Sequence, residues 1–221
     1  MPIRTVFFDV GETLVNETRL WAGWAHWLGV SDLAFFAVLG SIIERDEDHR
    51  QVFSYIRRSF NLERERASRK AAGFPDSFEI DDLYPDVRPC LNELREDGYK
   101  IGVAGNQPPD CDELFRDWAL PIDMVFSSSE LKVEKPSPDF FFRVAKAAGC
   151  APGEMAYVGD RLDNDVLPAR RAGMLAVFLR RGPWGLIHAR RPDAARAHIC
   201  LDSLDQLRGA LEALPGAALV G

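Results

Sequence analysis

The chain has 221 residues, which suits one large domain or a domain that carries an inserted module. Its formal net charge is −7 and its pI is about 5.2, which argues against nucleic acid or an anionic membrane as the main partner, since both need a basic face. Four scattered cysteines form no zinc-binding pattern, and no apolar run reaches the roughly 20 residues of a membrane helix. We therefore expect a cytoplasmic globular protein with reduced cysteines.

The first expected element is a buried strand over residues 5–8, a short apolar run rich in β-forming residues that stops at Asp9. Residues 16–80 lack a strand pattern and carry apolar side chains at helical spacing. These mark one helix face at Trp21, Trp24, Ala25 and Leu28, a second face, capped by Ser31, at Leu33, Phe36, Ala37 and Ile43, and further helices over 52–60 and 61–72. This part of the chain is predicted to be an all-helical block.

From Tyr84 onward the expected strands and helices alternate. The strands are expected at 100–104, 124–126, 155–158, 175–179 and 199–200, and the helices at 86–97, 110–118, 137–149, 163–172 and 203–214. This alternation predicts an α/β fold with a parallel sheet and helices on both of its faces. Ligands bind such sheets at the carboxyl ends of the strands.

Residues that can carry chemistry follow four of the expected strands. They are Asp9 after the first strand, Gly105 and Asn106 at the second, Lys135 beyond the third, and Asp160, Asp163 and Asp165 after the fourth. Clustered carboxylates repel one another unless a cation lies among them, and oxygen ligands favour Mg²⁺. A lysine balances the remaining charge and can hold an anionic substrate, a combination that suits phosphoryl transfer. Asp163 is expected to act only as a helix cap.

The segments that carry these residues resemble motifs of the haloacid dehalogenase (HAD) superfamily. Residues 8–14, Phe-Asp-Val-Gly-Glu-Thr-Leu, are similar to its first motif, Lys135-Pro136 to its third, and residues 159–165, Gly-Asp-Arg-Leu-Asp-Asn-Asp, to its fourth. The resemblance implies a Rossmann-like three-layer α/β/α core with a parallel sheet over residues 1–15 and 81–221. It also implies a small helical cap of the C1 type, inserted over residues 16–80.

The resemblance assigns catalytic and metal-binding roles to four carboxylate or backbone positions. Asp9 would be the nucleophile that attacks phosphorus and forms an aspartyl-phosphate. Asp9 would also bind Mg²⁺ together with the Gly11 carbonyl oxygen and Asp160. Asp165 would be a further ligand or would orient the metal site.

Four positions are similarly implied to bind the phosphate. Lys135 would steady Asp9 and the phosphoryl oxygens, and Thr13 would support the loop of the first motif. The backbone N–H of Gly105 would donate to the phosphate, and Asn106 would lie beside the incoming substrate. The expected substrate is a small phosphorylated or otherwise anionic metabolite, bound by a monomer or a homodimer.

Two positions depart from the usual phosphatase motifs. These motifs usually have a second Asp two residues after the nucleophile, and it protonates the leaving group. In this chain that position is Gly11. General acid–base catalysis of this kind is worth about 10²–10⁴ in rate. Glu12 and His26 are the candidates to replace it. The phosphate-binding hydroxyl of the second motif is replaced by Gly105. We therefore expect a slow or specialised Mg²⁺-dependent phosphohydrolase, for example one that acts on a substrate with a good leaving group.

Three alternatives remain open. A dehalogenase needs no acid at position 11 but generally lacks the metal, and a phosphonatase-like enzyme would need a lysine from the helical block, where Lys70 is the only one. A non-catalytic or regulatory binding protein on the same fold is the third. Residues 180–196 form a basic patch, which we interpret as a solvated loop anchored by Trp184 rather than as a docking site for an anion.

Overall fold

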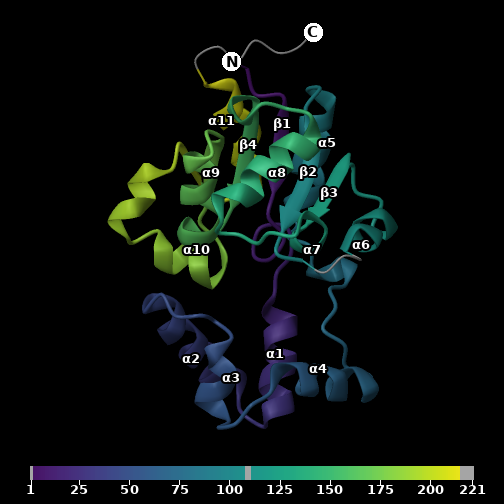
Figure 1. Cartoon of the computed structure of the whole chain (residues 1–221), viewed down its shortest axis with the longest axis vertical. Helices are drawn as coiled ribbons and strands as arrows, with labels where there is room; N and C mark the ends of the chain where they lie inside the picture. Colours follow the sequence, from purple (N-terminus) through teal and green to yellow (C-terminus); the bar gives the residue numbers. More distant parts are fainter. Residues whose placement is uncertain (1, 108–110, 215–221) are drawn as a thin grey trace. The chain divides into compact units, whose positions relative to one another are not determined.

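The structure, a computed structural model, describes residues 2–107 and 111–214 (Figure 1). The chain forms two compact units, Met1–Leu14 with Leu83–Gly221, and Val15–Asp82. The first unit contains the sheet, and the second is helical throughout its regular elements.

The sheet has six parallel strands in the order β3-β2-β1-β4-β5-β6, which confirms the predicted α/β fold. The strands are β1 (Thr5–Phe8), β2 (Lys100–Gly105), β3 (Met124–Ser127), β4 (Met155–Gly159), β5 (Leu175–Leu179) and β6 (Ile199–Leu201). The chain builds outward from β1 first on one side and then on the other, so the strand order reverses beside β1. In open α/β sheets the crevice for a ligand lies at the carboxyl ends of the strands beside such a reversal.

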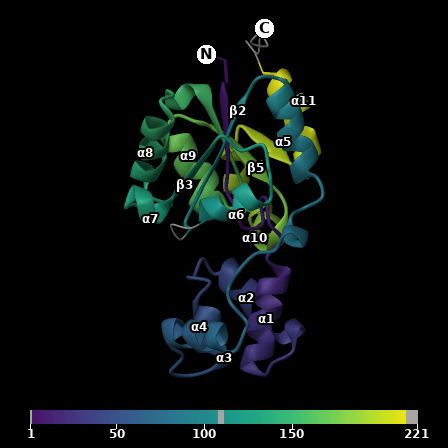
Figure 2. The ribbon, with the colours of Figure 1, turned by 90° about the vertical axis from the view of Figure 1, so that its right-hand side faces the viewer.

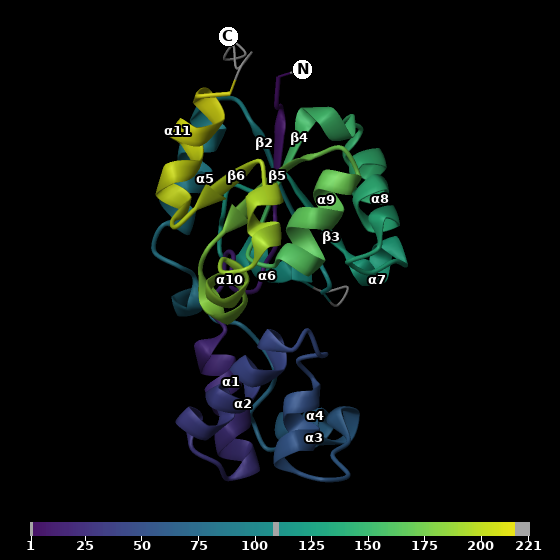
Figure 3. The ribbon, with the colours of Figure 1, turned by 90° about the vertical axis from the view of Figure 1, so that its left-hand side faces the viewer.

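Helices cover both faces of this sheet (Figures 2 and 3). One face carries α5 (Val87–Glu96) and α11 (Leu207–Glu212), and the other carries α7 (Ser128–Leu131), α8 (Pro138–Ala148) and α9 (Leu167–Arg171). The unit also contains α6 (Cys111–Asp117), α10 (Gly182–His188), the short turns η2 (Pro152–Glu154), η4 (Pro192–Arg196) and η5 (Leu204–Gln206), and the π-helical turn η3 (Leu162–Val166). Since helices cover both faces, the central strands are mainly apolar, and all four residues of β1 are buried.

Two segments of the unit that contains the sheet differ markedly from the sequence-based expectation. The helix expected over 163–172 begins as the π-helical turn η3, because Pro168 has no N–H to donate to the carbonyl of Asn164 and its ring crowds that carbonyl. The expected solvated loop around Trp184 is instead the helix α10, whose Trp184, Gly185 and His188 are buried. Position 110 of the expected helix over 110–118 lies outside the described residues.

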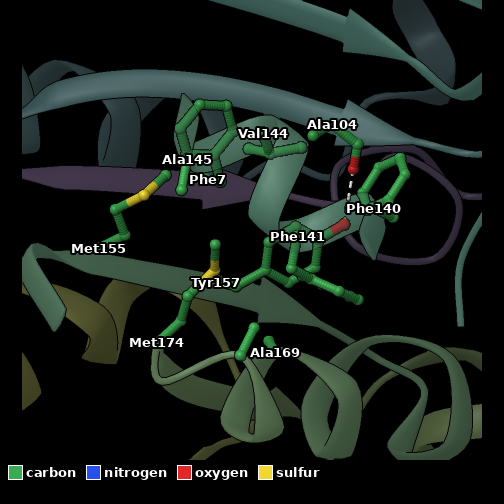
Figure 4. Packing of buried hydrophobic residues seen from close by; sticks show 11 residues of the cluster. Phe7, Ala104, Phe140, Phe141, Val144, Ala145, Met155, Tyr157, Ala169 and Met174 are labelled. Carbon is green, nitrogen blue, oxygen red and sulfur yellow. Dashed lines mark hydrogen bonds between the residues drawn. The ribbon is translucent and has the colours of Figure 1, made fainter. Parts of the chain in front are cut away.

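A compact cluster of aromatic and aliphatic side chains packs between β4, β1 and α8 (Figure 4). Within it the Phe141 and Tyr157 rings meet edge to face, with centroids 5.0 Å apart. The Tyr157 hydroxyl is fully buried and donates a hydrogen bond of 2.6 Å to the Ala104 carbonyl oxygen. This bond ties β4 to β2 across the central strand β1.

Replacing Tyr157 by Phe is expected to lower the free energy of unfolding by about 1–2 kcal/mol, because it removes this bond from a site that water cannot reach. Urea unfolding measures the change. The matched control is Tyr55→Phe, because the Tyr55 side chain is exposed. Loss of its hydroxyl should change the free energy of unfolding by less than about 0.5 kcal/mol. Equal effects of the two substitutions would contradict this account.

The helical unit contains α1 (Thr18–Leu28), α2 (Asp32–Glu44), α3 (Gln51–Ile56), α4 (Leu62–Ala71) and the turn η1 (Ile80–Asp82). The predicted face of α1 is confirmed, and its Trp21 and Trp24 pack against the Phe53 ring. The predicted face of α2 is wrong except at Ile43. The helix buries Phe35, Leu39, Ile42 and Ile43, whereas Leu33 is 82% exposed.

Among the described residues, no single helix is both long and apolar enough to cross a membrane. The bent pair of α1 and α2 passes that test together, by length and composition only.

Candidate active site and metal centre

Three carboxylates and a lysine meet at the carboxyl ends of β1 and β4. Asp9 follows β1, Asp160 follows β4, and Asp165 lies in η3. One oxygen from each of these carboxylates lies within 4.8 Å of the others, a spacing that can hold a metal ion. The Lys135 Nζ donates to Asp9 Oδ1 at 2.5 Å and to Asp165 Oδ1 at 2.6 Å. Sequence positions up to 156 residues apart are thus brought into one cluster.

The electrostatics of this cluster follow from its burial. The side chain of Lys135 is 1% exposed, and although burial opposes its charge, the carboxylates of Asp165 and Asp9 raise the pKa of the ammonium well above its usual value. Burial, followed by the charges of Asp165 and Asp9, raises the pKa of Asp160 well above its usual value. Burial also raises the pKa of Asp165 to about 6, even though Lys135 lowers it. One lysine therefore does not neutralise the three carboxylates.

The donor set fits a hard divalent cation such as Mg²⁺. The Asp160 Oδ2 atom is buried and has no hydrogen-bond partner in the described structure, an arrangement that costs about 1–3 kcal/mol or more unless another group binds it. All the cluster's acceptors are oxygens, the ligands that Mg²⁺ takes in proteins. A cation among these carboxylates would satisfy Asp160 Oδ2 and neutralise the excess negative charge.

Replacing Asp160 by Asn is expected to stabilise the protein in a chelating buffer. A carboxyl group whose folded pKa is raised binds its proton more tightly when folded, so the protein loses stability as the pH rises from the usual carboxyl pKa toward the raised one. At pH 7 the substitution should therefore raise the free energy of unfolding by about 0.5–2 kcal/mol.

Urea unfolding with and without Mg²⁺ measures both sides of this prediction. Mg²⁺ should stabilise the wild-type protein and should have little effect on Asp160→Asn, because the variant lacks a ligand. A variant that is less stable than the wild type in the chelating buffer would show that the Asp160 charge does not destabilise the folded protein.

Two glycines, Gly159 and Gly105, let the backbone approach the carboxylates of the cluster closely. A Cβ at Gly159 would lie 2.5 Å from Asp165 Cβ, so no side chain fits there. A Cβ at Gly105 would lie 3.0 Å from Asp9 Oδ1, tighter than most Cβ contacts. The side of Asp9 that faces Gly105 is thus occupied by backbone, at the position where the motif that this segment resembles usually has a hydroxyl.

The two remaining polar positions from the sequence prediction lie beside this cluster. Asn106 uses both ends of its amide on the backbone of Lys135, since its Oδ1 accepts from the Lys135 N–H at 2.8 Å and its Nδ2 donates to the Lys135 carbonyl at 3.0 Å. Thr13 is fully buried in the loop after Asp9, and its Oγ1 has no hydrogen-bond partner among the described residues. Asn106 therefore braces the backbone that presents Lys135.

Gly11 has no side chain that could donate a proton, and the Glu12 carboxylate is hydrogen-bonded to Tyr84. Glu12 has a positive φ of 51°, is buried, and accepts a hydrogen bond of 2.5 Å from the Tyr84 hydroxyl. Burial and then the Glu12 carboxylate raise the pKa of Tyr84 far above its usual value. A Cβ at Gly182 would clash with the Glu12 side chain, so the first residue of α10 packs directly against Glu12. His26, the second candidate, is exposed in the helical unit, with Nε2 3.1 Å from Asp32.

Sequence reasoning did not assign functions to several residues that hold the site together. Tyr84 holds Glu12, and the Arg181 guanidinium lies 4.2 Å from the centre of the Tyr84 ring and is paired with Asp86. His188 accepts from the backbone N–H of Leu162 at 3.2 Å, two residues after Asp160 in the sequence. These contacts join positions 26 to 97 residues apart, and no local pattern signals them.

Comparisons with known proteins agree on one family. The model for haloacid dehalogenase-like hydrolases matches residues 3–173. A glyceraldehyde 3-phosphate phosphatase from Methanopyrus kandleri is 42% identical over 116 residues, which cover 50% of this chain and 48% of that protein. A protein of the same name from Pyrococcus furiosus is 29% identical over 202 residues, which cover 82% of each chain.

Solved structures show the same fold at low sequence identity. A predicted phosphoglycolate phosphatase from Haemophilus somnus has a TM-score of 0.73 at 18% identity, covering 94% of this chain and 97% of that one. A HAD phosphatase from Thermococcus onnurineus has a TM-score of 0.61 at 24% identity, covering 99% and 100%. Because the family model matches most of this chain, residues 3–173, the chain belongs to the haloacid dehalogenase-like hydrolases.

Proposed function

We propose that the protein is a Mg²⁺-dependent phosphohydrolase that acts on a small phosphorylated metabolite through an aspartyl-phosphate at Asp9. The observation that carries the proposal is the buried cluster in which Lys135 bonds to both Asp9 and Asp165 beside the unpartnered oxygen of Asp160. The names of its relatives agree with this chemistry, since several are phosphatases of glyceraldehyde 3-phosphate, phosphoserine or phosphoglycolate.

In this proposal Asp9, Asp160, Asp165 and the Gly11 carbonyl hold Mg²⁺, which would neutralise charge on the phosphoryl group. An Asp9 carboxylate oxygen attacks phosphorus, and the bond from phosphorus to the leaving oxygen breaks. Water then attacks the phosphorus of the aspartyl-phosphate, and the bond from phosphorus to the Asp9 oxygen breaks. This step restores the Asp9 carboxylate and releases inorganic phosphate and a proton. Lys135 fixes the orientation of Asp9 and adds positive charge toward the phosphoryl oxygens.

Phosphate binding in this proposal also uses the backbone N–H of Gly105, with Thr13 supporting the first loop. Asn106 acts through Lys135, whose backbone it holds at both polar groups. The helical unit over 15–82 is proposed to be the cap that selects the substrate.

The leaving group must be one that needs little protonation. Gly11 has no side chain, and the Glu12 carboxylate is held by Tyr84. An acyl phosphate or an activated ester fits this requirement, because its leaving oxygen departs without a proton donor. We therefore propose that such substrates are turned over faster than simple alkyl phosphates.

A dehalogenase is the second candidate function that the missing acid suggests. Dehalogenase chemistry needs Asp9 but not a metal ligand set, and the three-carboxylate cluster favours phosphate chemistry instead. Chloride release from a 2-haloacid in a chelating buffer would support the dehalogenase.

Phosphate release from a metabolite panel tests the proposal. The panel contains acetyl phosphate, 4-nitrophenyl phosphate, glyceraldehyde 3-phosphate, phosphoserine and phosphoglycolate, each assayed with Mg²⁺ and with a chelator. Release that needs both Mg²⁺ and Asp9 is expected for at least one of the activated substrates. Turnover that proceeds equally well in the chelator would contradict the proposal.

A further inference from the structure

The helix α10 places a fully buried histidine behind the loop that carries two of the site's carboxylates. His188 is 1% exposed, and its Nδ1 accepts a hydrogen bond of 3.2 Å from the backbone N–H of Leu162. Leu162 lies between Asp160 and Asp165 in sequence and begins the turn η3. Because Nδ1 accepts, the neutral ring carries its proton on Nε2.

A second contact from the same helix reaches the neighbouring residue. The Arg161 guanidinium lies 5.1 Å from the centre of the Trp184 ring and donates two hydrogen bonds to Asp163. The Arg161 backbone N–H in turn donates to Asp165 Oδ2 at 3.1 Å. Although burial opposes the charge of Asp163, the bonds from Arg161 lower its pKa below the usual value, so this ion pair stays intact at neutral pH.

The position of α10 against the sheet is itself fixed. A Cβ at Gly185 would lie 2.8 Å from the carbonyl oxygen of Leu179, so the helix packs onto the end of β5 with no space for a side chain. The helix that carries Trp184 and His188 is therefore packed closely against the end of β5.

We propose that His188 is a positioning residue for the divalent metal: its bond to the Leu162 N–H fixes the turn that orients Asp160 and Asp165. The proposal rests on the Mg²⁺ site of the proposed function. In metal proteins, outer groups that orient the ligands typically change metal affinity or activity by 10–100-fold when they are mutated. His188 is connected to the ligands through the backbone of Leu162, so its effect should appear in metal affinity.

The test is calorimetric titration with Mg²⁺ alone, on the full chain, with a thermal unfolding curve for each variant. His188→Leu removes the acceptor and should weaken Mg²⁺ binding by about 10–100-fold. His188→Asn places an amide oxygen close to the position of Nδ1 and should retain most of the affinity. His188→Gln keeps a buried polar group but carries its oxygen farther out, so it should resemble His188→Leu and serves if that variant does not fold.

His198 provides a matched control from the same chain. Its Nδ1 also accepts from a backbone N–H, that of Ala176 at 2.9 Å, in the pairing of β5 with the segment before β6. His198→Leu removes the same kind of bond from the backbone of β5 and leaves the hydrogen bonds of η3 in place, so it should lower the melting temperature and leave the Mg²⁺ affinity unchanged.

The outcomes separate this proposal from the function on which it rests. Wild-type affinity in a folded His188→Leu or His188→Gln protein, or equal loss in His188→Asn, would overturn the positioning role and leave the Mg²⁺ site standing. A wild-type protein that does not bind Mg²⁺ would overturn both. Loss of affinity in His188→Leu and His188→Gln, with retention in His188→Asn and His198→Leu, would establish the role.

Discussion

Replacing Asp9 by Asn is expected to reduce Mg²⁺-dependent phosphate release by at least about 10⁴-fold, because the amide oxygen is a poor nucleophile. The substitution keeps the size of the side chain, and an amide oxygen can still accept from Lys135, so the fold should be preserved. The measurement is kcat with the best substrate of the panel, with circular dichroism and thermal unfolding as checks of the fold.

The control is Asp193→Asn, which removes a carboxylate from an exposed ion pair with Arg196. Surface pairs of this kind are worth about 0–1 kcal/mol, so both activity and stability should be close to wild type. An Asp9→Asn protein that keeps more than about a tenth of the wild-type rate would mean that another group attacks the substrate.

Replacing Gly11 by Asp is expected to raise kcat/KM for alkyl phosphates by about 10²–10⁴-fold, because it supplies the general acid that the chain lacks. The gain should be much smaller for acetyl phosphate, whose leaving oxygen needs little protonation. The ratio of the two values of kcat/KM is therefore the measurement, since it cancels changes in protein concentration and overall stability.

Gly11→Asn is the matched control for this gain. It has almost the same size as Asp but cannot serve as the acid, so it should leave the preference for acetyl phosphate unchanged. A rate increase that is the same for Asp and Asn, or the same for both substrates, would show that position 11 does not limit proton transfer. The plot of kcat/KM against pH should also gain a descending limb in Gly11→Asp alone.

The sequence was sufficient to predict the fold class and the meeting of Asp9, Lys135, Asp160 and Asp165. This succeeded because strands and helices alternate clearly after Tyr84, and parallel strands bring their carboxyl ends to one edge of the sheet. The roles of these residues stay predictions, which the substitutions above test.

The prediction failed where one local pattern allowed several structures. The helix α2 is apolar on most of its circumference, so spacing alone did not identify the face with Phe35 and Leu39. The helix α10 is too short to show a helical period, and its burial depends on distant partners: Trp184 against Arg161, and His188 against Leu162. Contacts of this kind depend on tertiary packing and leave no signal at fixed spacing.

In the proposed mechanism Asp9, held by Lys135 beside a Mg²⁺ site, receives a phosphoryl group. Beryllium fluoride mimics a phosphoryl group on a carboxylate, and fluorine NMR detects the bound form directly. We expect a bound signal in the wild-type protein that requires Mg²⁺ and disappears in Asp9→Asn. A bound signal that persists in Asp9→Asn, or its absence from wild-type protein with saturating Mg²⁺, would contradict the proposed mechanism.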